Sequence, residues 1–381
     1  MKKIRVGLIG YKFMGKAHSN AFFDVDKFFE LPAAPELSVI CGRDENGVRT
    51  AAKKYGWLEY ETDWKKLVRR KDIDLIDITT PNNAHKEIAI EAARNGKHIL
   101  CEKPLAMNVK DAEEMTRAVE KAGVVNMVNF NYRRVPAVAL MKQMIDEGKI
   151  GRVFHVRAVY LQDWIIDPKF PLVWRLTRKV CGSGSLGDLG AHLIDMARYL
   201  AGEFDSVNGL LETFIKQRPL PSEMSGLSAK GSGKKGKVDV DDAALFLVRF
   251  KSGAVGTFEA TRFAAGHKNN NQIEINGSKG SIIFNFERMN ELQYFNRADE
   301  AHVQGFRTIQ VGEGIHPYMA AWWPAGHIIG YEHTFIHGVA DLLKAVAEGK
   351  KVKPDFRDGL ACQKVMAAVS KSAVSKKWVK V

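Results

Sequence analysis

A lysine at the end of a short apolar run is the first residue of this chain whose setting suggests chemistry. Lys103 stands between Glu102 and Pro104, directly after the apolar residues 98–101. If that run is a strand, the lysine lies at its carboxyl end, where open α/β sheets bind ligands. The proline ends the strand and fixes the backbone beyond the lysine. The sequence therefore predicts an ammonium group held at a ligand-binding crevice.

Asp188 and His192 form a second candidate group. They lie four residues apart in a segment, residues 185–201, that is predicted to be helical, so they would share one helix face. A carboxylate one turn from an imidazole can orient the ring and raise its basicity. With Lys103, such a pair could accept the proton of an alcohol during oxidation. An ordinary surface pair at this spacing is the alternative.

The first turn of the chain has features of a dinucleotide-binding loop. It follows the apolar residues 4–9 and precedes a helix predicted over residues 14–25. The fingerprint is Gly-x-Gly-x-x-Gly between a strand and a helix; Gly10 and Gly15 are present, and Lys12 replaces the middle glycine. A lysine changes the backbone approach to a pyrophosphate, although its charge can meet a phosphate. A tight turn without a ligand is the alternative.

Two further strand ends bear on the cofactor. Gly42 stands where an acidic residue would bind the ribose 2′-hydroxyl, and Arg43 can pair with a 2′-phosphate. This pair favours NADP over NAD, unless Asp44 binds the ribose and Arg43 is merely solvated. At the end of another predicted strand, Pro81 breaks the strand and Asn83 can cap the next helix. That loop either lines the cofactor or serves only as a helix cap.

The order of elements predicts two kinds of domain. Strands and helices alternate over the first 130 or so residues, which predicts βαβ units in a doubly wound parallel sheet of the α/β Rossmann type. Strands with alternating polar and apolar residues then predominate, which predicts an α+β domain with an open, largely antiparallel sheet. An exposed sheet face of this kind favours a homodimer or homotetramer. Residues 216–238, rich in Pro, Ser, Gly and Lys, are predicted to be a loop.

We expect three segments: a dinucleotide-binding domain over 1–132, a substrate-binding and oligomerisation domain over 133–355, and a C-terminal helix and tail over 356–381.

Composition excludes several classes of protein. The chain has 381 residues, 45% hydrophobic and 27% charged, which is typical of a soluble two-domain protein. No apolar run is long enough to cross a membrane, and four separated cysteines without a CxxC pair indicate a cytoplasmic protein. The net charge of +13 raises nucleic-acid binding as an alternative, but the basic residues are dispersed, so no nucleic-acid partner is expected.

His333 and His337 lie four residues apart, a spacing at which two histidines on a helix could bind a metal ion. Neither an HExxH motif nor a carboxylate partner accompanies them, so no metal is expected.

Taken together, these motifs resemble those of the Gfo/Idh/MocA oxidoreductase family over nearly the whole chain. The segments that carry the resemblance are residues 10–15, Thr80-Pro81-Asn82 with His85, Glu102-Lys103-Pro104, residues 131–134, Trp174-Arg175, and Gly187-Asp188 with His192 and Asp195. Within the family, residues 160–164 and 192–200 are similar to those of levoglucosan and inositol-like sugar dehydrogenases. The family implies reversible hydride transfer between NAD(P) and a hydroxyl carbon of a sugar, inositol or related polyol.

The motifs and the resemblance together imply a set of site residues. Lys103, Asp188 and His192 are the expected catalytic group. The expected cofactor contacts are Gly10, Lys12, Phe13, Met14, Gly42, Arg43, Thr80, Pro81, Asn82, His85, Glu102, Lys103, Asn131, Trp174 and Arg175. The expected substrate contacts are Tyr132, Arg134, Gln162, Trp164, Asp188, His192 and His327, because neutral polyols need aromatic and amide groups.

The expected function is therefore an NAD(P)-dependent oxidoreductase that acts on a secondary hydroxyl or ketone of a sugar, anhydrosugar, glycoside or inositol. A keto-sugar reductase and a non-catalytic regulator that senses nucleotides on the same fold are the alternatives. The regulator should lack the catalytic group, which this chain retains.

Overall fold

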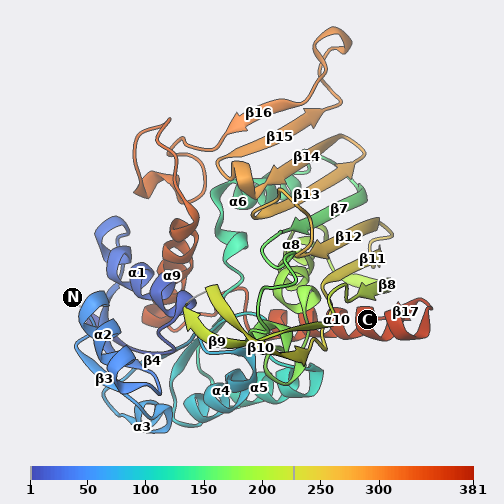
Figure 1. The fold of residues 1–381 in the computed structure, drawn as a ribbon. Helices are drawn as coiled ribbons and strands as arrows, with labels where there is room; N and C mark the ends of the chain where they lie inside the picture. Colours follow the sequence, from blue (N-terminus) through green and yellow to red (C-terminus); the bar gives the residue numbers. More distant parts are fainter. Residues whose placement is uncertain (1, 226–227) are drawn as a thin grey trace. The chain divides into compact units, whose positions relative to one another are not determined.

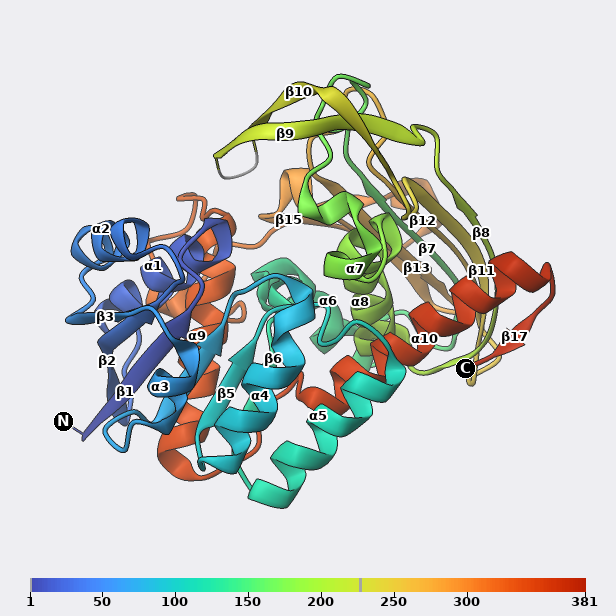
Figure 2. The same ribbon diagram turned by 60° about the horizontal axis from the view of Figure 1, so that its bottom comes forward.

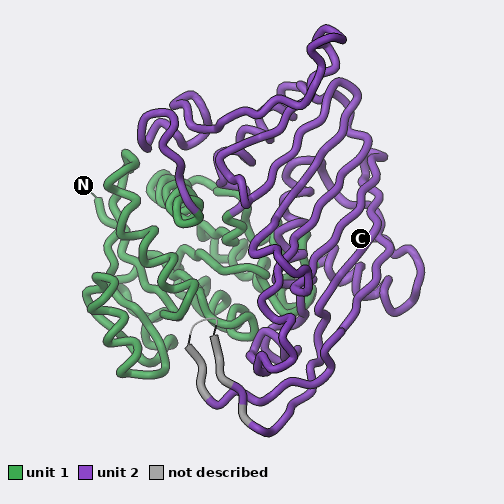
Figure 3. The backbone as a smooth tube through the Cα atoms, turned by 45° about the horizontal axis from the view of Figure 1, so that its top comes forward, with its two compact units in different colours: residues 1–131, 225–227, 331–363 green, residues 132–224, 228–330, 364–381 purple. Residues whose placement is uncertain are grey.

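The computed structural model describes residues 2–225 and 228–381, which form two compact units (Figure 3). Unit 1 contains residues 2–131 and 331–363. Unit 2 contains residues 132–224, 228–330 and 364–381.

Unit 1 is built on a six-stranded parallel sheet in the order β3-β2-β1-β4-β5-β6. Its strands are β1 (Lys2–Ile9), β2 (Ala33–Cys41), β3 (Glu59–Glu61), β4 (Leu75–Ile78), β5 (His98–Cys101) and β6 (Asn126–Val128). Val6, Leu8 and Ile76 are fully buried, as expected of strands covered on both faces. This order confirms the doubly wound Rossmann sheet that the alternation of elements predicted.

The helices of unit 1 cover both faces of this sheet (Figure 2). They are α1 (Phe13–Phe28), α2 (Glu45–Tyr55), α3 (Trp64–Arg69), α4 (His85–Arg94), α5 (Val109–Ala122) and α9 (Tyr331–Glu348). Helix α1 packs against α9, whereas α4 packs against α3 and α5. Local sequence sets the helix ends: Asn108 caps α5 by accepting from the N–H of Asp111, and α2 ends at the left-handed Gly56.

Unit 2 is built on a nine-stranded sheet in the order β16-β15-β14-β13-β7-β12-β11-β8-β17 (Figure 1). Its strands are β7 (Val153–Leu161), β8 (Phe204–Glu212), β11 (Ala243–Phe250), β12 (Val255–Thr261), β13 (Asn270–Gly277), β14 (Gly280–Asn285), β15 (Glu291–Asn296), β16 (Arg307–Gln310) and β17 (Val379–Lys380). Among the described strands of this nine-stranded sheet, only β7 and β12 pair in parallel, so the largely antiparallel sheet is confirmed.

Helices cover one face of this sheet. Helix α8 (Ala191–Ala201) packs on β7 and β13, and α6 (Pro136–Asp146) packs on β14 and β15. Strand β11 shows the resulting alternation, with Phe246 buried and its neighbour Leu247 exposed. The remaining helices are the short α7 (Arg178–Cys181) and α10 (Phe356–Ser375), which begins in unit 1 and ends in unit 2.

One local prediction is wrong. Residues 216–238 were expected to be a loop, but they form β9 (Gln217–Ser225) and β10 (Ser228–Lys237), which pair as a two-stranded sheet. Residues 226 and 227 lie outside the described part of the chain. The buried guanidinium of Arg218 supports this ribbon, because it donates to the carbonyl oxygens of Ile165, Asp167 and Phe170.

The segment that carries Asp188 and His192 is also less regular than predicted. Instead of one helix over residues 185–201, a π-helical turn (Leu186–Gly190) leads into α8. Turns of this type inside helices are frequent at functional sites. Within the part of the chain that is described, no helix is long and apolar enough to span a bilayer.

Candidate functional site

The turn after β1 is packed so tightly that it requires glycine at two positions. Gly10 has φ of +107°, and a Cβ added there would lie 2.8 Å from the carbonyl oxygen of Thr79. A Cβ at Gly15 would lie 2.0 Å from the carbonyl oxygen of Gly10, so both positions require glycine. Lys12 occupies the N-cap position of α1, and its side chain makes no capping hydrogen bond. The open helix N-terminus suits an anionic pyrophosphate.

The end of β2 contains a feature that the sequence did not reveal. The ring of Tyr11 lies over Gly42, where an added Cβ would be 2.3 Å from the ring. The Tyr11 hydroxyl donates to Oδ2 of Asp44 at 3.2 Å. Arg43, which lies between Gly42 and Asp44 in sequence, has an exposed side chain. Tyr11 thus holds a carboxylate near the position where a ribose diol is bound in this fold.

The loops after β4 and β5 are tied together by buried contacts. Thr79 donates through Oγ1 to the carbonyl oxygen of Gly10 at 2.7 Å. The ring of His85 lies between the carbonyl oxygens of Thr80 and Pro104, at 3.0 and 3.1 Å. Burial lowers the pKa of His85, which favours the neutral ring. The predicted residues Thr80 and His85 therefore lie beside the Lys103 turn.

A buried imidazole stands behind the same turn, and sequence reasoning missed it. His18, on α1, has Nδ1 2.8 Å from Oδ2 of Asp77 and Nε2 2.9 Å from Oε1 of Glu102. Asn129 donates to the same Glu102 oxygen at 2.6 Å. Asp77 and Glu102 lie 59 and 84 residues from His18 in sequence, so no local pattern indicated this cluster.

The remaining predicted cofactor residues occupy more varied positions. Phe13 and Met14 begin α1, and Pro81 and Asn82 belong to the turn between β4 and α4. Asn131 is buried and donates to Oγ1 of Thr334 at 2.9 Å, so part of its amide is used inside unit 1.

Trp174 and Arg175 belong to unit 2. They form a short 3₁₀ turn, with the Arg175 guanidinium carbon 4.3 Å from the centroid of the Trp174 ring. Trp174 packs at the edge of an apolar cluster that includes Ile165 and Val173.

Aromatic side chains surround His192 in unit 2. The ring of Tyr132 lies 4.5 Å from the His192 ring, measured between centroids, and that of Tyr160 lies at 6.0 Å. The two tyrosine hydroxyl oxygens are 2.7 Å apart, and the Tyr160 hydroxyl also donates to Oδ1 of Asn269 at 2.7 Å. The predicted residues Tyr132 and His192 are therefore neighbours. Tyr160 contacts both of them, and Asn269 accepts a hydrogen bond from Tyr160. The sequence patterns did not indicate Tyr160 or Asn269 as site residues.

The same hydrogen-bonded row continues to two more predicted residues. Gln162 donates through Nε2 to Oδ1 of Asn269 at 2.9 Å, and Trp164 donates through Nε1 to Oε1 of Gln162 at 2.9 Å. Rings and amides in such a row suit a neutral polyol. Arg134 is buried, and His327 lies in an exposed loop with Nδ1 2.8 Å from the carbonyl oxygen of Pro324. Contact of either residue with a sugar stays a prediction.

Asp188 is held by a buried arginine. Nη2 of Arg262 donates to Oδ2 of Asp188 at 2.8 Å, and the Arg262 side chain is 1% exposed. A guanidinium at this distance favours the ionised carboxylate. Sequence reasoning could not find this partner because it lies 74 residues away.

The expected catalytic group is divided between the units. Lys103 belongs to unit 1, whereas Asp188 and His192 belong to unit 2. Its joint action on one substrate therefore stays a prediction. Among the described residues, no group of three or more His, Cys, Asp or Glu side chains is placed to hold a metal ion.

Comparisons with known proteins agree with this arrangement. Residues 4–130 match the oxidoreductase family with an NAD-binding Rossmann fold, and residues 138–283 match the GFO/IDH/MocA C-terminal domain. The chain is 47% identical to levoglucosan dehydrogenase from Pseudarthrobacter phenanthrenivorans over 386 aligned positions, which cover 100% of this chain and 99% of the relative.

Solved structures are similarly close. An oxidoreductase domain protein from Kribbella flavida superposes with a TM-score of 0.95 at 52% identity and covers 100% of both chains. Levoglucosan dehydrogenase in complex with NADH and levoglucosan superposes with a TM-score of 0.95 at 46% identity, over 100% of this chain and 99% of that one.

Proposed function

This chain belongs to the Gfo/Idh/MocA oxidoreductase family, and we propose that it is a dehydrogenase of an anhydrosugar or a related sugar, glycoside or inositol. The observation that carries the proposal is the row of rings and amides beside His192, which offers a neutral polyol both stacking surfaces and hydrogen bonds. Full-length similarity to a dehydrogenase of levoglucosan supports the same substrate class.

Three residues have separate roles in the proposed reaction. His192 accepts the proton of the reacting hydroxyl, and Lys103 stabilises the developing alkoxide through its positive charge. Asp188, fixed as a carboxylate by Arg262, sets the electrostatic surroundings of His192. The nicotinamide, when bound, supplies hydride transfer to or from the carbinol carbon. This mechanism requires Lys103 from unit 1 and His192 from unit 2 to act on one substrate.

The cofactor is held by unit 1 in this proposal. Gly10 and Gly15 allow the tight packing of the turn that begins α1, and the N-terminus of α1 with Lys12 attracts the charge of the pyrophosphate. Thr80, Asn82 and His85 are the proposed residues beside the nicotinamide half. On the other unit, Trp174 and Arg175 remain proposed cofactor contacts.

The choice between NAD and NADP rests on the end of β2. Arg43 is the residue that favours NADP, as the sequence suggested. Against it, the carboxylate of Asp44, held by Tyr11, would repel a 2′-phosphate and accept from the ribose hydroxyls. Because the structure of levoglucosan dehydrogenase also contains NADH, we propose that NAD is the preferred cofactor and NADP the poorer one.

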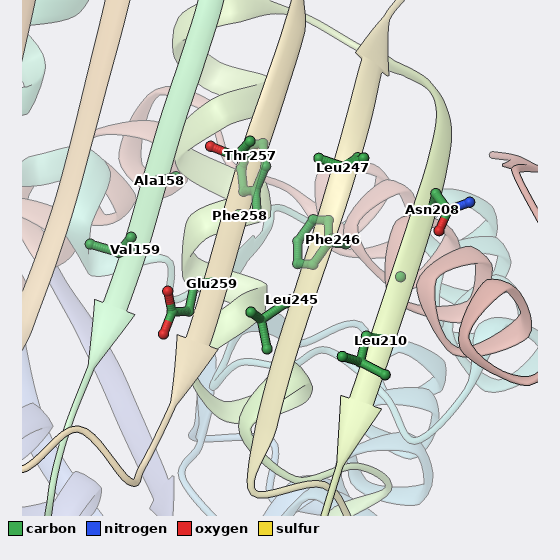
Figure 4. Close-up of a pocket in the computed structure, with 11 residues that line it drawn as sticks. Ala158, Val159, Asn208, Leu210, Leu245, Phe246, Leu247, Thr257, Phe258 and Glu259 are labelled. Atoms are coloured by element: carbon green, nitrogen blue, oxygen red, sulfur yellow. The ribbon is translucent and has the colours of Figure 1, made fainter. Parts of the chain in front are cut away.

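We also propose that the chain forms a homodimer or homotetramer through the outer face of the nine-stranded sheet. Figure 4 shows Leu210, Leu245 and Leu247 on neighbouring strands around a shallow hollow. These three leucines are 57, 40 and 50% exposed, and together they form an apolar surface larger than scattered single residues would give.

We propose a reducing cytoplasmic location, because the four cysteines are buried and lie far apart in sequence without a CxxC pair.

The proposed function is tested with purified protein, NAD or NADP, and a panel of levoglucosan, glucose, other aldoses and inositols. Formation of reduced nicotinamide is followed by absorbance. The proposal expects turnover with at least one anhydrosugar or related polyol and faster turnover with NAD. The reverse assay, with keto-sugars and NADH, measures the reductase direction. Absence of turnover with every compound in both directions would contradict the proposal.

A further inference from the structure

Two buried carboxyl groups face one imidazole ring in unit 1. Asp77 lies on β4, Glu102 directly follows β5, and His18 lies on α1 between them. Their exposed fractions are 0, 4 and 1%. Each ring nitrogen of His18 lies within 3.0 Å of a carboxylate oxygen, one from each acid.

This geometry fits a charged ring. A neutral imidazole has a single N–H, so it could donate to Asp77 only, with Nε2 accepting from the amide Nδ2 of Asn129 at 3.0 Å and facing Glu102 with its lone pair. A charged ring donates to both carboxylates. Burial alone would lower the pKa of His18, but Asp77 and Glu102 outweigh it and raise that pKa to about 10. The group therefore contains two negative charges and one positive charge, a net charge of −1.

Among the residues that the structure describes, no cation contributes to the shift of the His18 pKa. The Phe335 ring of α9 packs against His18, with centroids 5.5 Å apart. The Cys101 thiol has a pKa well above its usual value because it is buried, and His85 has a lowered pKa for the same reason. Lys103, which follows Glu102 in sequence and is half-buried, is a cation whose charge lowers the pKa of Glu102.

Glu102 is joined to Lys103 directly. Its Oε2 accepts from the backbone N–H of Lys103 at 3.2 Å. Burial alone would raise the pKa of Glu102, but the hydrogen bond and charge of His18, with a further contribution from Lys103, lower it. The carboxylate that precedes the lysine therefore depends on His18 for its ionised state.

We propose that His18 is a positioning residue for Lys103: its imidazolium keeps the Glu102 carboxylate ionised and fixed beside the lysine. This inference rests on the proposed function, because Lys103 is the group that meets the reacting oxygen. Without the ring, two buried carboxyl groups would share a proton, as closely spaced acids do. The negative charge beside the lysine would then be weakened, and the lysine turn would lose its anchor.

A charge-rescue experiment tests the proposal. His18→Gln keeps a polar side chain but removes the positive charge, and we expect kcat to fall about tenfold or more with a changed pH profile. His18→Gln combined with Asp77→Asn leaves Glu102 without a second acid to share its proton, so its carboxylate is ionised again, and we expect kcat to return to within about threefold of the unaltered chain. Ser19→Ala is the matched control, because Ser19 is a buried neighbour on α1 that accepts a hydrogen bond from Trp57.

The outcomes separate charge from packing. A double variant no more active than His18→Gln, or a loss of kcat in Ser19→Ala equal to that in His18→Gln, would overturn the proposal. A second measurement uses nitrogen NMR of the His18 ring in the unaltered chain at pH 8, assigned through its change in Asp77→Asn. An imidazolium signal is expected, and a neutral ring would overturn the proposal even if His18→Gln failed to fold. The NMR result does not depend on sugar turnover, so it fails separately from the proposed function.

Discussion

At the scale of single residues, the ionisation of the candidate site is controlled by partners far away in sequence. Arg262 holds Asp188, and His18 holds Glu102. Neither partner lies in a recognisable motif. Each of them, however, contacts a residue that belongs to a motif: Arg262 contacts Asp188, and His18 contacts Glu102. These contacts explain how the motif side chains keep their charges in buried or half-buried surroundings.

Replacing Arg262 with Met should impair catalysis more than cofactor binding. The Asp188 carboxylate would lose its guanidinium partner, and we expect kcat to fall about tenfold or more, with NADH affinity nearly unchanged. Arg262→Lys should recover part of the activity. Steady-state kinetics and NADH fluorescence titration give the two quantities.

Arg157→Met is the matched control, because Arg157 is an exposed arginine of unit 2 whose partner, Glu274, lies at 3.2 Å. Exposed pairs contribute little, so its kcat should stay close to that of the unaltered chain. Equal effects of Arg262→Met and Arg157→Met would contradict the assigned role.

Replacing Asp44 with Ser should relax the preference for NAD. Removing the carboxylate that Tyr11 holds would remove repulsion of a 2′-phosphate, while Arg43 remains available to bind it. The ratio of the NADPH and NADH dissociation constants, from fluorescence titration, should shift toward NADPH by about tenfold. Glu45→Gln, at the neighbouring acid, is the control, and an unchanged ratio in Asp44→Ser would refute the assignment.

At the scale of elements, the β9–β10 ribbon supports the segment that presents Trp164. Arg218 on β9 donates to three backbone carbonyl groups of residues 165–170, which directly follow that tryptophan. Arg218→Leu should therefore release this segment and raise KM for the sugar about tenfold, with a smaller change in kcat. Lys216→Leu, at an exposed position just before β9, should leave KM unchanged. A sugar KM that is the same in both variants would show that the ribbon does not support the site.

The sequence predicted most elements because their patterns are local. Buried strands such as β4 and β5 are short, mostly apolar segments, and α5 carries its own capping residue. The ribbon escaped prediction because Gly, Ser and Lys have low strand propensity, and its stability comes from a buried arginine that contacts a distant loop. The π-helical turn at Leu186–Gly190 likewise has no periodic signal.

Candidate site residues were likewise predictable where they belong to a local motif and not where they depend on long-range contacts. Motifs placed Lys103, Asp188 and His192, and also Gln162 and Trp164, which the structure joins in one row. Tyr11, His18 and Arg262 were missed because their importance comes only from contacts made in the fold. His327 belongs to an exposed loop, and its contact with the substrate stays a prediction.

At the scale of the whole molecule, stability should depend on the charge of His18. A pKa of about 10 in the folded chain, against an ordinary value of 6.5, means that the ring stabilises the fold fully below pH 6.5. This contribution, on the order of a few kcal/mol, is lost as the pH rises toward 10.

Thermal denaturation from pH 7 to 10 should therefore show a larger fall in Tm for the unaltered chain than for the variant with His18→Gln and Asp77→Asn. Parallel curves would contradict the charged ring.

Assembly should depend on the leucines of the outer sheet face. Leu245→Glu with Leu247→Glu places two charges on strand β11, where they would be buried in an interface, so the oligomer should dissociate to monomers. Size-exclusion chromatography with light scattering measures the mass. Ile315→Glu alters an 88% exposed residue that belongs to no strand of this sheet and should leave the oligomer intact. An unaltered chain that is already monomeric would refute the interface.

The most direct test of the central claim compares the unaltered chain with Lys103→Met, using levoglucosan and NAD. Reduced nicotinamide is followed by absorbance, and NADH binding by fluorescence. We expect the unaltered chain to oxidise the sugar and Lys103→Met to lose at least about a thousandfold in kcat, while it still binds NADH. Oxidation of the sugar by Lys103→Met at the unaltered rate would contradict the account.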